Sequence, residues 1–166
     1  MSITTILKEK SANRNKLFLD YKLKNKKLPI GIVLLKDDLI DQVLIDALNI
    51  LPANFIISWK NKNFDNNHNI AFLDDNFQNS GFDFVVCDDC EDDIMKYMRK
   101  WAVPIIYSAH TLSNLLSEFN AAKVEGNAYI FENNNLCDIY YAIIRYLENY
   151  KFSYDNKALV KNVLDV

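Results

Sequence analysis

The sequence predicts an α/β protein with a parallel, doubly wound sheet. Continuous apolar runs recur along the chain, which is typical of parallel strands covered by helices on both faces. Segments with helical spacing of apolar residues separate several of these runs. The chain has 166 residues, of which 50% are hydrophobic, so one domain with one core is expected. Alternating strands and helices of this kind favour a three-layer α/β sandwich.

About six strands are predicted, each from an apolar run bounded by polar or turn-forming residues. The first run, Ile-Gly-Ile-Val-Leu-Leu, is uninterrupted by charge and begins directly after Pro29. The runs at 54–59 and 82–87 are equally long but contain polar residues such as Ser58 and Asp83, and the other three runs are shorter. The six predicted strands are residues 30–35, 54–59, 70–73, 82–87, 104–107 and 128–131.

Helices are predicted between these strands and after the last one. Apolar residues between Ile40 and Leu51 fall at i, i+3, i+4, i+7, i+8 and i+11, which indicates a helix with one buried face. Further helices are expected over residues 92–101, 112–119 and 136–147, with a short one near 17–21 and closing turns near Leu159 and Val163. In the last long helix we expect Tyr140 to pack inward and the other aromatic residues to decorate the surface. The alternative is that these aromatic residues form a carbohydrate or partner surface.

Charge and hydropathy exclude two classes of partner. The net charge is −3 and both signs are interspersed, so no basic face for nucleic acid is expected. No apolar run approaches the roughly 20 residues that cross a bilayer, and residues 1–10 are too polar for a signal peptide. The three cysteines are an odd number, which agrees with a reducing compartment. We therefore expect a cytoplasmic protein without nucleic-acid or membrane partners.

Glycine is scarce for a domain of this class. The sequence has 3 glycines, whereas average usage of about 7% would give roughly twelve. Glycine allows the backbone to approach a phosphate closely. The shortage therefore argues against an intact nucleotide site.

Several segments keep the order and spacing of one family. They are Asn15-Lys16-Leu17, Pro29-Ile-Gly-Ile-Val, Val43-Leu-Ile-Asp-Ala-Leu, Phe82-Asp83-Phe-Val-Val, Val103-Pro104-Ile-Ile and the segment from Glu125 to Glu132. In this order they resemble the nucleotide-sugar-binding, C-terminal domain of GT-B glycosyltransferases of the glycogen/starch synthase type. The resemblance implies a Rossmann-like domain over residues 13–166, after a polar segment 1–12, without the N-terminal domain of those enzymes.

The resemblance breaks at the loop after the first strand. In the family this loop carries Ser-Arg-Leu-Thr followed by Gln-Lys-Gly, and its two cations neutralise the donor diphosphate. Here the loop reads Leu35-Lys36-Asp37-Asp38-Leu39. Lys36 falls where the arginine would be, which makes it a candidate phosphate contact or an ordinary exposed lysine. Nothing matches the second cation, and Asp37 and Asp38 would repel phosphate.

The loops after the fourth and fifth strands also depart from the family. Its two carboxylates, seven residues apart beside the transferred sugar, are represented here only by Glu91, because Lys96 falls on the second position. The family's Thr-Gly-Gly-Leu is replaced by Ala109-His110-Thr111-Leu112. The resemblance therefore makes Lys36, Glu91, His110 and Thr111 weak nucleotide-sugar-binding candidates and leaves no catalytic residue.

Other polar motifs have a functional and a structural interpretation. The acidic run from Asp88 to Asp93 offers oxygen ligands to Mg²⁺ or forms a solvated loop and helix cap. Cys87-x-x-Cys90 resembles redox and zinc motifs, but the two histidines, His68 and His110, are not clustered with it in sequence. His110 lacks an accompanying nucleophile motif. The structural interpretation is favoured for each, so no metal and no cofactor are predicted.

Three functions remain open from the sequence. The first is a non-catalytic binding or interaction module that takes a nucleotide sugar, a glucan, a protein partner or a second copy. The second is one half of a split glycosyltransferase that uses ADP- or UDP-glucose and needs a partner chain. The third is a receiver-like signalling domain, because Asp37, Asp38, Asp88 or Asp89, and Ser108 imitate a phospho-acceptor pocket. Enzymatic activity is uncertain, and the loss of site motifs favours its absence.

Overall fold

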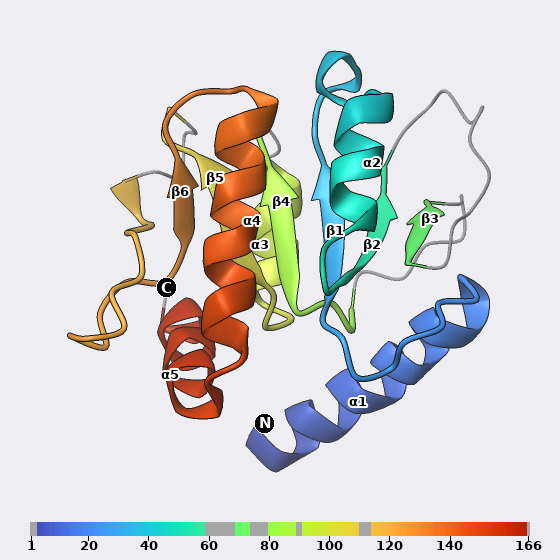
Figure 1. The fold of residues 1–166 in the computed structure, drawn as a ribbon. Helices are drawn as coiled ribbons and strands as arrows, with labels where there is room; N and C mark the ends of the chain where they lie inside the picture. The colour runs from blue at the N-terminus through green and yellow to red at the C-terminus, as the bar shows by residue number, and fades with distance from the viewer. Residues whose placement is uncertain (1–2, 59–68, 74–79, 89–90, 110–113, 166) are drawn as a thin grey trace.

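The computed structural model describes residues 3–58, 69–73, 80–88, 91–109 and 114–165. Its centre is a sheet of six strands (Figure 1). All neighbouring pairs are parallel, and the strand order is β3-β2-β1-β4-β5-β6. The strands are β1 (Ile30–Leu34), β2 (Asn54–Ile57), β3 (Ile70–Phe72), β4 (Phe84–Cys87), β5 (Val103–Tyr107) and β6 (Tyr129–Phe131). The predicted Rossmann-like α/β fold with about six parallel strands is confirmed.

Five α-helices are described around this sheet. They are α1 (Ile3–Asp20), α2 (Gln42–Asn49), α3 (Glu91–Met98), α4 (Leu136–Tyr150) and α5 (Ser153–Leu164), with a short 3₁₀ helix, η1 (Asp37–Leu39). In Figure 1, α2 and α4 cover one face of the sheet and α3 lies behind the opposite face. The helices α1 and α5 lie at the end of the sheet where the strands begin. Among the described helices, none is both long enough and apolar enough to cross a membrane.

The core is continuous from the sheet to α4. The strands β1, β2 and β4 are buried along their whole length. The Tyr146 ring of α4 packs on Phe84 of β4 with a centroid separation of 4.7 Å, and Phe84 meets Phe55 of β2 edge to face at 5.8 Å. Aromatic pairs in these geometries stabilise a core beyond the area that they bury.

The inward face of α4 differs from the prediction. Its buried positions include Ile139, Ile143 and Tyr146, whereas Tyr140 is partly buried and packs against the same core. Tyr146 can be buried in the core because its hydroxyl donates to the carbonyl of Asp83 (3.4 Å). A buried phenol requires such a partner, and periodicity could not locate one 63 residues away.

The predicted helix over residues 112–119 was wrong where the structure describes it. Residues 114–119 form no α-helix, and residues 112–113 lie outside the described part. The Asn127 side chain accepts from the Ser117 amide (2.9 Å) and donates to the Leu115 carbonyl (3.3 Å). The Phe119 amide donates to the Ala128 carbonyl (2.8 Å). Backbone groups that a helix would use internally are therefore satisfied by the strand region beside them.

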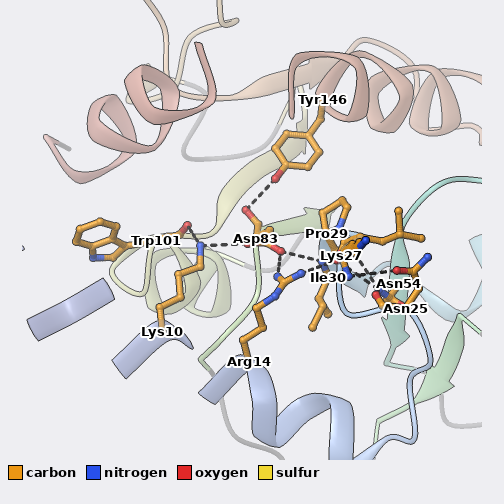
Figure 2. Close-up of polar contacts among 11 residues, drawn as sticks. Lys10, Arg14, Asn25, Lys27, Pro29, Ile30, Asn54, Asp83, Trp101 and Tyr146 are labelled. Carbon is orange, nitrogen blue, oxygen red and sulfur yellow. Dashed lines mark hydrogen bonds and ion pairs between the residues drawn. The ribbon is translucent and has the colours of Figure 1, made fainter. Parts of the chain in front are cut away.

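A charged cluster at the start of β4 attaches α1 to the sheet (Figure 2). We call Lys10, Arg14 and Asp83 the Asp83 cluster. The Asp83 carboxylate forms ion pairs with Arg14 and with Lys10 (3.5 Å), and it accepts from the Ile30 amide (2.9 Å). Burial lowers the pKa of Lys10, and the charge of Asp83 opposes this change. The contacts of Lys10 and Arg14 explain why α1 extends upstream of the short helix predicted near residues 17–21.

The strand order also bears on the receiver-like alternative. In the order 2-1-3-4-5 of receiver and flavodoxin-like domains, the first strand lies between the second and the third. Here β1 lies between β2 and β4, and β3 is at the edge. The topology is therefore the six-stranded Rossmann-like order, which disfavours a receiver-like domain.

Candidate functional site

The candidate site is the edge of the sheet where the strands end, which we call the carboxyl edge. In open α/β sheets, ligands bind outside the carboxyl ends of the strands, where the direction of strand connection reverses. That reversal lies between β1 and β4, whose ends are in register at Leu34 and Cys87. The described parts of the loops that follow β1, β4, β5 and β6 therefore form the candidate site (Figure 1).

The loop after β1 places one cation among several carboxylates. Lys36 is exposed and immediately precedes η1, whose residues include Asp37 and Asp38. The Lys36 carbonyl accepts from the Leu39 amide (3.0 Å), which forms the turn of η1. Asp41 then caps α2, because its carboxylate accepts from the Leu44 amide (2.8 Å). The positive end of α2 is thus already neutralised by a carboxylate of the chain itself.

The loop after β4 contains a buried carboxylate. Asp88 is 3% exposed and directly follows Cys87, the last residue of β4. The Asn134 amide, from the loop between β6 and α4, donates to Asp88 Oδ2 at 3.5 Å. Within the described part of the chain, Oδ1 of Asp88 and Oδ1 of Asn134 have no hydrogen-bond partner. The carboxyl edge therefore retains two unsatisfied oxygen acceptors beneath its surface.

The loops after β5 and β6 are joined by hydrogen bonds. The Ser108 amide donates to the Phe131 carbonyl (2.9 Å), and its hydroxyl donates to the Glu132 carbonyl (3.4 Å). At the start of α4, the Asn135 side chain accepts from the Asp138 amide (3.0 Å). The Asp138 carboxylate in turn accepts from the amide and the side chain of Asn133 (3.0 and 2.8 Å). The N-terminus of α4, like that of α2, is capped from within the chain.

Two of the four candidate residues from the sequence lie within the described part of the chain. Lys36 lies at the carboxyl edge as expected. Glu91 is the first residue of α3, so its backbone is at the same edge. His110 and Thr111 lie outside the described residues. The roles of Lys36 and Glu91 stay predictions.

Asn134 is the site residue that sequence reasoning missed. It lies between Asn133 and Asn135 in a run of three asparagines before α4. The run signals a helix cap, but it does not show which of the three reaches the β4 loop. That choice depends on the order of the strands in the sheet.

The chemistry available at this edge is mainly that of acceptors. Asp37, Asp38, Asp41, Asp88 and Asp138 are all within its described loops or first helical turns. In the described part of the molecule, no group of three or more histidine, cysteine or acidic side chains is arranged to hold a metal ion. Cys87 is buried, and Cys90 lies outside the described residues. The carboxylates in the described part of this edge accept hydrogen bonds and repel a polyanion.

Comparison with known proteins identifies the fold. No family model matches the sequence, and no curated protein matches it. Among solved structures, the catalytic domain of starch synthase IV from Arabidopsis thaliana, bound to ADP and acarbose, is similar with a TM-score of 0.69 and 15% sequence identity. The match covers 95% of this chain and 39% of that chain. At this identity the likeness concerns the fold and not the activity. The chain has the Rossmann-like fold of a GT-B C-terminal-type domain, as the resemblance implied.

Proposed function

We propose that this chain is a non-catalytic, glycosyltransferase-like binding module whose ligand is a neutral oligosaccharide rather than a nucleotide sugar. The proposal rests on one observation: in the loop after β1, where a diphosphate would need positive charge, Asp37 and Asp38 follow Lys36 directly and Asp41 caps α2. A helix N-terminus attracts phosphate through its unpaired amides and its dipole. At α2 one such amide, that of Leu44, already binds Asp41.

The balance of charge around Lys36 supports the same conclusion. Lys36 is followed immediately by Asp37 and Asp38. A diphosphate placed on Lys36 would therefore also approach two carboxylates, and like charges at such short range oppose binding. A neutral glucan carries no charge to repel, and its hydroxyls are donors that carboxylate and amide oxygens accept.

The exposure of the carboxyl edge supports a role without catalysis. Sugar transfer requires a site that excludes water from the reacting atoms. Lys36, Asp37 and Asp38 at the carboxyl edge are exposed, so a second body would have to cover them.

A panel of ligands tests this proposal. Thermal shift and calorimetry would compare maltoheptaose, ADP, ADP-glucose and UDP-glucose, and a transfer assay would offer glycogen as acceptor. We expect saturable binding of maltoheptaose, no stabilisation by the nucleotides and no transfer. Sugar transfer by the purified chain, or nucleotide-sugar binding without glucan binding, would overturn the proposal. If no ligand in the panel binds, the carbohydrate assignment is wrong and a protein partner replaces it.

A split glycosyltransferase is the second candidate, and the exposed position of Lys36 at the end of β1 favours it. In that case ADP-glucose or UDP-glucose would raise the melting temperature, and Lys36→Ala would reduce the effect. Lys16→Ala is the matched control, because Lys16 is also exposed but belongs to α1. Equal responses of both variants would argue against a donor site at Lys36.

A further inference from the structure

A cavity of about 470 Å³ lies at the opposite end of the sheet from the carboxyl edge. Its walls come from three segments: Lys10 of α1, Trp101 after α3, and the α5 residues Lys157, Val160, Lys161 and Leu164. Asp83, at the start of β4, also lines the cavity. The volume lies within the range of about 300–1,000 Å³ that small-molecule sites occupy.

The charge around this cavity is positive. In the Asp83 cluster, two cations share one carboxylate, so one positive charge remains. Lys157 and Lys161 are exposed and four residues apart on α5. Side chains at this spacing lie on the same face of a helix, and like charges there repel each other. An anion between them would relieve that repulsion.

The apolar part of the cavity contains a residue in an unfavourable backbone conformation. Trp101 has φ 72°, in the left-handed region, where a bulky residue is an outlier. The position follows the end of α3, and the Trp101 amide donates to the Met98 carbonyl (2.8 Å). Glycine is the usual residue at such a helix end.

Two interactions of Trp101 accompany its unfavourable backbone conformation. Trp101 is 6% exposed, so burial of its side chain offsets the backbone cost. Its carbonyl accepts from Lys10 Nζ (3.1 Å), as Figure 2 shows. Trp101 thus binds Lys10 through its carbonyl and also lines the same cavity.

We propose that this cavity binds a small amphipathic anion, with its apolar body against Trp101 and Val160 and its anionic group between Lys157 and Lys161. The Asn156 side chain, which also lines the cavity, adds a hydrogen-bonding group beside the anion. Carboxylate and phosphate groups share the required chemistry, and the test below separates them. This site is independent of the glucan site proposed at the carboxyl edge.

Fluorescence of Trp101 tests the proposal directly. The sequence contains two tryptophans, Trp59 and Trp101, so a Trp59→Phe background leaves Trp101 as the reporter. The probes are 1-naphthyl phosphate, 1-naphthoate, the neutral 1-naphthol and inorganic phosphate. We expect saturable quenching by at least one of the two aromatic anions, and at least tenfold weaker binding of 1-naphthol and of inorganic phosphate.

Two variants separate charge from shape. Lys157→Ala with Lys161→Ala should weaken binding of the anionic probe at least tenfold without unfolding the protein, because both side chains are exposed. Lys16→Ala with Lys123→Ala removes two exposed lysines elsewhere and should leave binding unchanged. Val160→Phe should reduce the affinity for every probe by filling the cavity. Equal affinity of the wild type and the Lys157/Lys161 variant, or no saturable quenching by either aromatic anion, would refute the proposal.

Discussion

Arg145 and Glu118 form an ion pair that covers the outer edge of β6. The Glu118 carboxylate accepts from the Ile130 amide (2.7 Å), and the Arg145 guanidinium donates to the Ile130 carbonyl (2.6 Å). The guanidinium also lies over the rings of Tyr129 and Tyr141, at 5.7 and 5.2 Å from their centroids. The ion pair therefore satisfies both the amide and the carbonyl of Ile130. Unpaired backbone groups on an edge strand would otherwise offer a template for another strand.

We expect Arg145→Ala to destabilise the fold and to promote self-association. Loss of the bond to Ile130 and of the ring contacts should cost about 1–2 kcal/mol. The exposed edge should also make sedimentation depend on protein concentration. Urea unfolding and analytical ultracentrifugation measure the two effects.

Lys151→Ala is the control for this prediction. It removes an exposed ion pair with Glu148 on the surface of α4 (2.6 Å), which should cost less than about 0.5 kcal/mol. A variant at Arg145 that behaves like the Lys151 control would show that the edge does not depend on the pair.

Asp83→Asn should be strongly destabilising. The neutral amide would leave Lys10 and Arg14 largely buried without a balancing charge. Removal of one partner from a buried ion pair costs about 3–5 kcal/mol. Urea unfolding would measure the loss, with Asp46→Asn on the exposed side of α2 as control. A loss below 1 kcal/mol would mean that the cluster contributes little to the attachment of α1.

Gly31→Ala should destabilise the protein through a clash in the sheet. A Cβ at position 31 would lie 2.1 Å from Phe84 Cζ, because the ring covers the neighbouring strand at this residue. Overpacking of this kind costs typically 1–3 kcal/mol. Adding Phe84→Leu should recover part of the loss in a double-mutant cycle. Strictly additive effects would show that the ring is not the cause.

Alkaline pH should destabilise the protein through Tyr146. Burial raises the pKa of Tyr146 well above its ordinary value of 10.0, and the charge of Asp83 adds to the effect. Below pH 10 the phenol is protonated in both states, so its contribution to stability is complete. As the pH rises past 10, the unfolded state loses the proton first, and the free energy of unfolding falls by up to about 1.4 kcal/mol per pH unit.

Urea unfolding of the wild type and Tyr146→Phe at pH 8, 10 and 11 checks this expectation. The variant should lose less stability than the wild type between pH 10 and 11. Tyr154→Phe is the control, because Tyr154 is 73% exposed, and its pH dependence should match that of the wild type. Parallel curves for Tyr146→Phe and the wild type would contradict the prediction.

The order of apolar runs along the sequence was sufficient to predict the strands and the fold class. A strand buried on both faces must be apolar throughout, so β1 and β4 are visible as uninterrupted runs. The helix α2 is visible for a similar reason, because its buried residues recur with the helical period. The family resemblance also led us to expect a site in the loops after β1, β4 and β5, and this expectation stays a prediction.

The tertiary structure decided which distant groups meet. Asp88 and Asn134 are 46 residues apart, and Asp83 and Arg14 are 69 residues apart. Their pairing follows from the order of strands and the path of α1, and neither leaves a periodic signal in the chain. Asn127 likewise prevents the helix predicted after β5, because local propensity is weaker than hydrogen bonds supplied from a neighbouring segment. Periodicity thus predicted the helices and strands. Long-range polar contacts decided which side chains meet at the two ends of the sheet, where we propose that ligands bind.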